Sequence, residues 1–432
     1  MIKKEYKQIN ETLYTETLPN GLTVYLLPKK DYHKTYGLFS TNYGSIDNEF
    51  VPLGETDFIH VPDGIAHFLE HKLFEKEDGD VFGKFGKQGA SANAFTSFTK
   101  TSYLFSSTSQ VFENLETLLD FVQEPYFTKE SVDKEKGIIG QEIQMYQDDA
   151  NWRLFIGLLE NMYPKFPLSI DIVGTVESIS KITAEDLYTC YRTFYHPSNM
   201  NLFVVGNLVP EEMMNFIREN QEKKEFAPIV PIKRRFSKQK STDIIKERTI
   251  NMSVTRPKFI LGIKGIDELP KIGRELATYE MSITLFLQLL LGSTSKNYLK
   301  LYDAGLIDDT FYAEGFSLER EFHFAEISGD SDEPKKVIQK LEEILLNFES
   351  SEELTEGALD KLKKRTIGKY FQSLNSLEFI ANQFSQNLYE DVTLFDVIEI
   401  VESLTMENIL ENAHHFIQKN AFSHFYIYPN EK

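Results

Sequence analysis

Residues 67–71 read His-Phe-Leu-Glu-His, and this pentapeptide decides how the rest of the chain is interpreted. Residues four positions apart on an α-helix share a face, so His67 and His71 can direct both imidazoles at one metal ion. Glu70 is close enough to reach a water molecule on that ion without being a ligand. Neutral imidazoles suit zinc, and the sequence therefore predicts a zinc site. The competing interpretation is a metal-free surface turn in which two histidines occur by chance.

The flanking residues predict a helix, a flexible stretch and then a strand. Asp63-Gly64 supplies a helix cap before Ile65. Residues 83–90 are rich in glycine and are predicted to be flexible. Residues 91–105 alternate small or polar residues with aromatic ones, which is typical of a strand. An exposed edge strand beside the helix would suit peptide binding by strand addition, although an ordinary sheet edge explains the pattern equally well.

A zinc site with two histidines needs a third ligand, and the charged segment 129–152 offers candidates. The segment is predicted to be helical, and Glu135 and Glu142 would then stand two turns apart on one face. One of them could bind the metal while the other orients a ligand or takes part in proton transfer. Charged helices are usually only solvated faces, so the residues alone leave both assignments open.

Four motifs of this chain form a recognisable set. They are HFLEH, Asn93-Ala94-x-Thr96, Thr101-x-Tyr103 and Glu135-Lys136-x-x-Ile139-x-x-Glu142-Ile143. The reversed order of the histidine motif is the inverted zincin pattern. Together these motifs resemble the pitrilysin and insulinase zinc metallopeptidases, and in particular their short, two-lobed bacterial members related to processing peptidases. The resemblance covers nearly the whole chain.

This resemblance implies a role for each candidate residue. One Zn²⁺ per chain would be held by His67, His71 and Glu142. Glu70 would be the catalytic general base, and Glu135 the second catalytic glutamate, which supports the site without binding the metal. The strand residues expected to bind the substrate backbone are Ala92, Asn93 and Ala94.

Length and internal similarity predict two domains. A chain of 432 residues is too long for one compact core. Segments of the first half recur in the second, which indicates a duplicated α/β unit. We expect an N-terminal lobe with the zinc site over 1–221, a linker over 222–242 and a C-terminal lobe over 243–432. The echoes are 112–119 with 338–345, 176–179 with 401–404, and the strands 201–205 with 423–427.

The predicted fold class is α+β, with two duplicated α/β sandwich lobes that each pack helices on a mixed sheet and together form half of a clamshell. The second copy lacks the zinc motif. Its helix at 276–291 has no histidine, and the position matching Glu142 falls at about Lys369. This lobe is expected to form the far wall of a substrate cleft.

Composition narrows the partners and the compartment. The net charge of −20 argues against nucleic acid and modestly favours basic peptides. We predict no membrane span, because no run of about 18 apolar residues occurs. A single cysteine, Cys190, excludes an internal disulfide framework, and no secretion signal is visible. The expected location is the cytoplasm.

One departure from the family pattern predicts a partner. Active relatives carry an arginine and a tyrosine seven residues apart in the second copy, which hold the substrate and stabilise the oxyanion. Leu301 and Asp308 stand at those positions here. We therefore expect this chain to be the zinc-bearing half of a heterodimer whose paralogous subunit supplies the pair. The competing explanations are a shifted alignment of this segment, or a homodimer that uses other donors, with Lys300, Tyr302 and Tyr312 nearby.

The predicted activity is that of a metalloendopeptidase acting on peptides or small unfolded polypeptides. Glu70 would take the proton of the attacking water and deliver it to the leaving amine. The alternative is a non-catalytic subunit that binds peptides or acts as a scaffold and retains its zinc site. A purely structural zinc would usually have four protein ligands, and His60, the one further candidate, precedes the helix.

Overall fold

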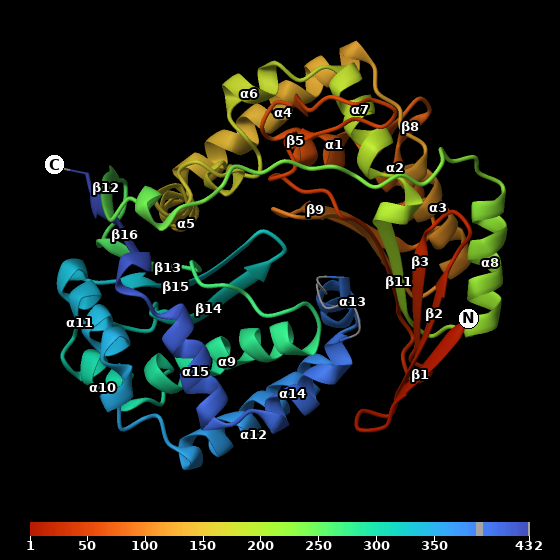
Figure 1. Cartoon of the computed structure of the whole chain (residues 1–432). Helices are drawn as coiled ribbons and strands as arrows, with labels where there is room; N and C mark the ends of the chain where they lie inside the picture. Colours follow the sequence, from red (N-terminus) through yellow and green to blue (C-terminus); the bar gives the residue numbers. More distant parts are fainter. Residues whose placement is uncertain (386–391, 431–432) are drawn as a thin grey trace. The chain divides into compact units, whose positions relative to one another are not determined.

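The computed structural model describes residues 1–385 and 392–430, and Figure 1 shows the course of the chain. The chain forms two compact units, each built around its own sheet. Both sheets are mixed and carry helices, so the predicted α+β class with two lobes of this kind is confirmed. The first unit comprises Met1–Gln144, Ile170–Phe236 and Ser373–Gln386, and the second Met145–Ser169, Ser237–Gln372 and Asn387–Lys432.

The first unit contains a seven-stranded sheet. Its third and fourth strands, β3 and β11, are parallel, and every other neighbouring pair is antiparallel. In spatial order the strands are β1 (Ile2–Tyr6), β2 (Glu11–Thr17), β3 (Thr23–Pro28), β11 (Met200–Gly206), β4 (Thr35–Thr41), β10 (Thr101–Ser107) and β9 (Ala90–Thr96). Strand β9 therefore lies at an edge.

Helices cover both faces of this sheet, which is why β4 is buried along its whole length. Leu38 and Phe39 are successive residues of β4 and so point to opposite faces. On the face of Phe39, its cross-strand neighbour Tyr103 contacts Phe121 of α3 (Val111–Gln123), with ring centroids 5.7 Å apart. On the face of Leu38, its neighbour Phe203 packs against α13 (Leu377–Ser385). Helix α8 (Pro210–Glu222) also contacts β3 and α3.

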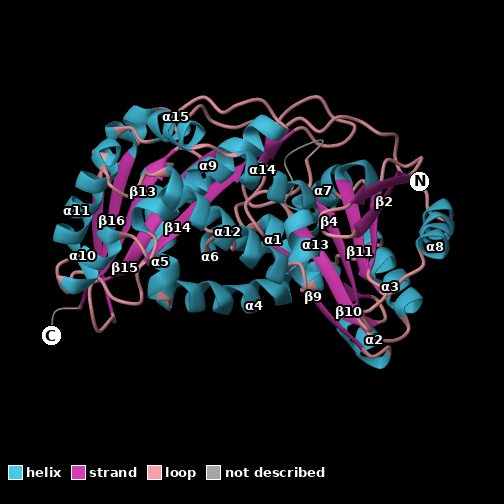
Figure 2. Cartoon of the chain, turned by 90° about the horizontal axis from the view of Figure 1, so that it is seen from below, coloured by secondary structure: helices cyan, strands magenta, loops and turns pink. Residues whose placement is uncertain are grey.

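The second unit contains a five-stranded sheet with the same arrangement. Its first pair, β12 and β16, is parallel, and the remaining pairs are antiparallel. The order is β12 (Glu247–Met252), β16 (Phe422–Pro429), β13 (Lys258–Lys264), β15 (Phe322–Asp330) and β14 (Tyr312–Glu319). This order and these directions repeat β3–β11–β4–β10–β9 of the first sheet, so the predicted duplication is confirmed (Figure 2).

One face of the second sheet carries the main apolar core of its unit. Buried residues of β13, including Phe259 and Leu261, form this core with α9 (Arg274–Leu291), α11 (Pro334–Leu346) and α15 (Met406–Phe416). In the described part of the chain no single helix is both long and apolar enough to cross a membrane; the bent pair α9 and α10 (Lys296–Asp303) meets the criterion only when combined.

The other face of the second sheet is covered by α5 (Ala150–Met162), a helix from the first half of the chain. The approach is close: a Cβ atom added to Gly157 would lie 2.4 Å from the ring of Phe425 in β16. Reciprocally, α13 comes from the second half and covers the first sheet. These two exchanged helices distinguish the compact units from the lobes predicted at 1–221 and 243–432.

Further helices flank the two sheets. They are α6 (Val176–Ser180), α7 (Ala184–Phe194), α12 (Glu356–Ser373) and α14 (Val397–Ser403), and two short hairpins pair β5 (Glu49–Phe50) with β6 (Ile59–His60) and β7 (Glu75–Lys76) with β8 (Gly79–Asp80).

The prediction of a flexible stretch at 83–90 is wrong, because α2 (Val81–Lys87) occupies most of it. The carboxylate of Asp80 caps the helix by accepting from the backbone N–H of Phe82 at 2.7 Å. Phe85 is buried between Phe105 and Phe121, with ring centroids about 6 Å from each. Burial of this ring offsets the roughly 1 kcal/mol that each glycine costs inside a helix.

Candidate active site

Helix α1 (Ile65–Leu73) carries the histidine motif and begins at the predicted residue. Its N-cap is Gly64, whose φ of 87° is a conformation that favours glycine. A Cβ atom there would lie 2.5 Å from the carbonyl oxygen of Val173. Capping by Asp63 is a wrong prediction, because its carboxylate accepts instead from the side-chain amide of Asn48 at 2.9 Å. Close backbone packing therefore positions the start of α1.

Most polar residues of α1 are buried along with its apolar ones, and His71 is partly buried. Phe68 and Leu69 are fully buried, while His67 and Glu70 are only 8% and 7% exposed. The Nδ1 atom of His67 is buried without a hydrogen-bond partner among the described residues. Burying polar side chains costs free energy unless they have partners or ligands, so packing alone does not account for the polar residues of this helix.

Helix α4 (Lys129–Asp148) supplies both predicted glutamates to the histidines. Glu135 is buried, and its Oε1 lies 3.0 Å from Nδ1 of His71. Glu142 faces both rings: its Oε1 is 3.6 Å from Nε2 of His67, and its Oε2 is 3.6 Å from Nε2 of His71. These last two distances exceed those of hydrogen bonds. The two glutamates thus differ in their contacts: Glu135 lies within hydrogen-bond distance of Nδ1 of His71, and Glu142 faces the Nε2 atoms of both histidines.

The cluster of His67, His71 and Glu142 fits a zinc ion. One ligand atom from each residue lies within 4.8 Å of the others, and among the described residues this is the one such cluster. Tetrahedral zinc with bonds of about 2.0–2.2 Å places neighbouring ligand atoms roughly 3.3–3.6 Å apart, in agreement with the 3.6 Å separations here. Three protein ligands leave a fourth position for water or substrate, as in catalytic sites.

The two histidines differ in protonation: His67 is held neutral, whereas the carboxylates around His71 favour a positive charge there. Burial lowers the pKa of His67 to about 3, with a further contribution from His71, so His67 is a neutral imidazole with a free lone pair. Burial also lowers the pKa of His71, but the hydrogen bond with Glu135 and the charges of Glu70 and Glu142 outweigh it and raise the pKa overall. A cation between the histidines and Glu142 would replace that proton.

Glu70 lies beside the cluster and is held by the edge strand. Its Oε2 accepts from the hydroxyl of Thr96 at 2.5 Å. Burial raises its pKa to about 7, partly countered by the bond from Thr96. Thr96 received no role in the sequence analysis, although it ends the Asn93-Ala94-x-Thr96 motif. That fixed spacing was the signal that could have identified it.

The predicted backbone-binding residues lie on β9, and the prediction that this strand is an edge is confirmed. Ala92 and Ala94 are partly buried, and Asn93 is exposed. The side-chain oxygen of Asn93 accepts from the backbone N–H of Ala94. The strand that anchors Glu70 through Thr96 is therefore the same strand whose outer edge is open to an added chain.

The second unit has no equivalent cluster among its described residues. Lys369, which matches Glu142 in the duplicate, is exposed on α12. Leu301 is buried in the core, and Asp308 forms an ion pair with Arg256 at 2.5 Å. Neither residue can serve as an oxyanion donor. His60 is exposed on the short strand β6 and lies outside the zinc cluster.

Comparisons with known proteins match two family descriptions to two successive parts of the chain. The family described as Insulinase (Peptidase family M16) matches residues 61–176, and the Peptidase M16 inactive domain matches residues 181–366. The uncharacterized zinc protease YmfH of Bacillus subtilis (strain 168) is 53% identical over 410 residues, which cover 95% of this chain and 95% of the relative.

Two solved structures share the fold. An M16-like protein from Alicyclobacillus acidocaldarius superposes with a TM-score of 0.92 and 35% identity, covering 97% of this chain and 99% of that chain. A protease from Helicobacter pylori superposes with a TM-score of 0.81 and 18% identity, covering 96% and 99%. The histidine cluster lies within residues 61–176, the span matched by the first family, and the span matched by the second, residues 181–366, covers β12 to β15 of the second sheet but not β16.

Proposed function

Because this chain belongs to the insulinase family of peptidases, family M16, we propose that it is a zinc-dependent endopeptidase of peptides or small unfolded polypeptides. The observation that carries this proposal is the convergence of His67, His71 and Glu142 next to the buried carboxylate of Glu70. A structural site would usually be closed by a fourth protein ligand, whereas this one is open.

The roles of the residues follow from their contacts. When bound, zinc supplies Lewis acidity that polarises water or a peptide carbonyl. Glu70, held by Thr96, accepts the proton of the attacking water and then donates it to the leaving amine. Glu135 keeps Nδ1 of His71 engaged, so that Nε2 stays directed at Glu142 and the metal position. The substrate would lie extended along β9, adding a strand at its open edge.

The metal assignment is tested by zinc affinity. Glu142→Ala removes one of three ligands and should weaken zinc binding by more than about a hundredfold, a larger loss than a change outside the ligand shell produces. Glu130→Gln, an exposed carboxylate on the same helix, is the matched control. Zinc affinity can be measured by competition with a chromophoric chelator. Unchanged affinity in Glu142→Ala would contradict the ligand set.

We further propose that the chain is the catalytic half of a heterodimer. Burial of Leu301 and the ion pair of Asp308 with Arg256 support this, because both positions of the expected donor pair are committed to structure. A paralogous subunit without the histidine motif would supply the arginine and tyrosine. Loss of one oxyanion donor costs about 10²–10³ in rate, so the chain alone should be slow.

The decisive measurement is hydrolysis of an internally quenched, unstructured peptide by the zinc-loaded chain, alone and mixed with candidate paralogues. Activity that appears only in a mixture supports the split site. Equal activity of the isolated chain would contradict it and favour a homodimer with donors from this chain.

A second function has one observation in its favour. The absence of the donor pair at Leu301 and Asp308 also fits a non-catalytic subunit that binds peptides and retains zinc. Peptide binding without hydrolysis in every mixture, with zinc bound, would support that alternative. The cytoplasmic location stays a prediction, and the single buried cysteine, Cys190, is consistent with it.

A further inference from the structure

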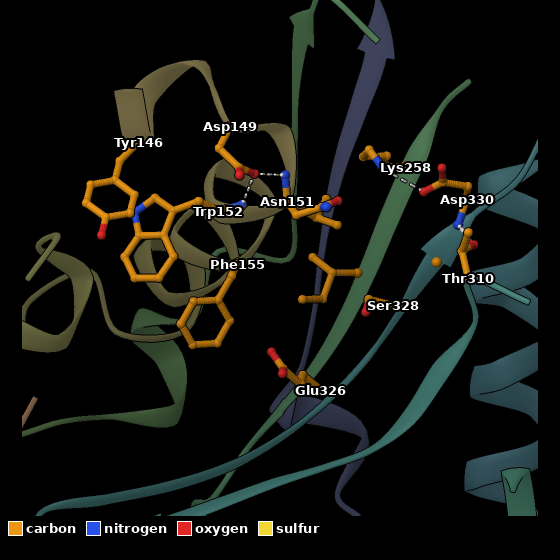
Figure 3. Close-up of a pocket in the computed structure, with 13 residues that line it drawn as sticks. Tyr146, Asp149, Asn151, Trp152, Phe155, Lys258, Thr310, Glu326, Ser328 and Asp330 are labelled. Carbon is orange, nitrogen blue, oxygen red and sulfur yellow. Dashed lines mark hydrogen bonds and ion pairs between the residues drawn. The ribbon is translucent and has the colours of Figure 1, made fainter. Parts of the chain in front are cut away.

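A cavity of about 640 Å³ lies in the second unit, between the first turns of α5 and the sheet strands β13 and β15 (Figure 3). Aromatic side chains form one side of it. Trp152 is flanked by Tyr146 and Phe155, with ring centroids 5.1 and 6.2 Å apart. Trp152 and Phe155 are three residues apart on α5 and so share a face. The cavity has the size and the aromatic lining of a ligand site.

Glu326 of β15 faces this aromatic side. In Figure 3 its carboxylate points toward the side of the cavity where Phe155 lies. Its Oε2 atom is buried and has no hydrogen-bond partner among the described residues. Desolvation raises the pKa of this carboxyl group to about 7. A buried carboxylate oxygen without a partner costs free energy, and a donor from a ligand would remove that cost.

The other charged residues of the cavity are already engaged. Lys258, the cation of the lining, pairs with Asp330 at 2.8 Å, and these two residues stand opposite each other on β13 and β15. The carboxylate of Asp149 caps α5, accepting from the backbone N–H groups of Asn151 and Trp152. Glu326 therefore has a carboxylate oxygen that is available to a ligand, and the acidic residues of the lining outnumber its one basic residue.

We propose that this cavity binds a positively charged side chain of a peptide, arginine first of all, with its guanidinium on Glu326 and its stem against Phe155 and Trp152. A guanidinium pairs with a carboxylate through two parallel hydrogen bonds and also stacks on aromatic faces, so both walls of the cavity suit it. The chain's net charge of −20 adds a general attraction for basic peptides. The peptide nature of the ligand rests on the proposed function; recognition of the cation does not.

Trp152 makes the proposal directly testable, because it is the chain's single tryptophan and it lines the cavity. The probe is a short blocked peptide with one arginine, titrated into the full chain in the presence of a metal chelator while Trp152 fluorescence is recorded. A peptide with citrulline, the neutral analogue of arginine, is the matched ligand control. Chelation separates this test from hydrolysis, so a failure of the peptidase proposal and a failure of this one are distinguishable.

We expect saturable binding of the arginine peptide and binding of the citrulline peptide at least about tenfold weaker. Glu326→Gln should remove that preference, while Glu411→Gln, an exposed carboxylate on α15, should leave it unchanged. Glu326→Gln removes a buried charge without a partner, so it should fold, and circular dichroism confirms this before titration. Equal affinity for the two peptides, or an unchanged preference in Glu326→Gln, would overturn the proposal.

Discussion

Glu70 in the first unit is buried and Glu326 in the second is partly buried, and desolvation raises the pKa of each carboxyl group to about 7. Their surroundings differ. Glu70 accepts from Thr96 and lies beside a cluster that can hold a metal ion. Glu326 has an oxygen without a partner in the described part of the chain, and it faces aromatic rings. Both carboxylates therefore lose solvation, Glu70 in a polar cluster that suits proton transfer and Glu326 in an aromatic cavity that suits a cation.

The largest expected effect tests the first of these settings. Glu70→Gln keeps the shape of the side chain but removes its ability to accept a proton, so peptide hydrolysis should fall about 10³-fold while zinc remains bound. Hydrolysis of the quenched peptide and metal content by mass spectrometry check the two parts. Glu77→Gln, an exposed neighbour, is the control. Retention of most activity in Glu70→Gln would show that the base lies elsewhere.

Glu135 is another buried glutamate, and its partner is a histidine. Glu135→Gln should weaken zinc binding about 10- to 100-fold through loss of the charged bond to His71, a smaller loss than for Glu142→Ala. The same chelator competition measures it. If the order of the two variants were reversed, Glu135 would be the ligand and Glu142 the orienting residue.

Glu326 should affect stability rather than hydrolysis chemistry. Its pKa is about 7 in the folded chain and about 4.5 when unfolded, so the folded state binds its proton more tightly. The stability from this group is present below pH 4.5 and is lost as pH rises through 7. Because one pKa unit corresponds to about 1.4 kcal/mol and partial solvent access reduces the sum, the loss is about 2 kcal/mol.

Glu326→Gln lacks this titration, so its free energy of unfolding should gain about 2 kcal/mol relative to the natural chain between pH 5 and pH 8. Urea denaturation of both proteins at the two pH values measures the difference. Comparing two pH values cancels the constant cost of burying the new amide. A difference that does not change with pH would mean that Glu326 titrates normally.

The smallest effect concerns the anchor that Glu70 has and Glu326 lacks. Thr96→Val keeps the branched shape but removes the hydroxyl that donates to Glu70, so hydrolysis should fall about tenfold. Thr96→Ser restores the donor and should recover most of the rate. If Thr96→Val and Thr96→Ser behaved alike, the hydrogen bond would not position the carboxylate.

Sequence patterns predicted those parts of the candidate site whose residues lie close together in the chain. The spacing of His67, Glu70 and His71 on one helix, and of Glu135 and Glu142 on another, gave both helices of the site. The structure adds which glutamate faces which nitrogen, a distinction that spacing alone left open. The repeated segments likewise predicted the duplication that the matching strand orders confirm.

Features that depend on tertiary packing were not visible in the sequence. Glycines at 83 and 86 suggested flexibility, yet burial of Phe85 holds α2 in place. Asp63 stands where a capping residue is expected, but its carboxylate accepts from the side-chain amide of Asn48, 15 residues earlier in the chain. The cavity that contains Glu326 is lined by α5 and by strands more than a hundred residues later in the chain, so no local pattern could reveal it.

The exchange of α5 and α13 has a consequence for the history of the chain. Separated at 222–242, the first fragment would carry α5 without the sheet that it covers, and it would expose the face of its own sheet that α13 protects. The second fragment would have the converse defect. Each copy of the duplicated unit thus completes the other's fold, so the second copy, in whose described residues no metal cluster occurs, still supplies a helix that the first sheet needs.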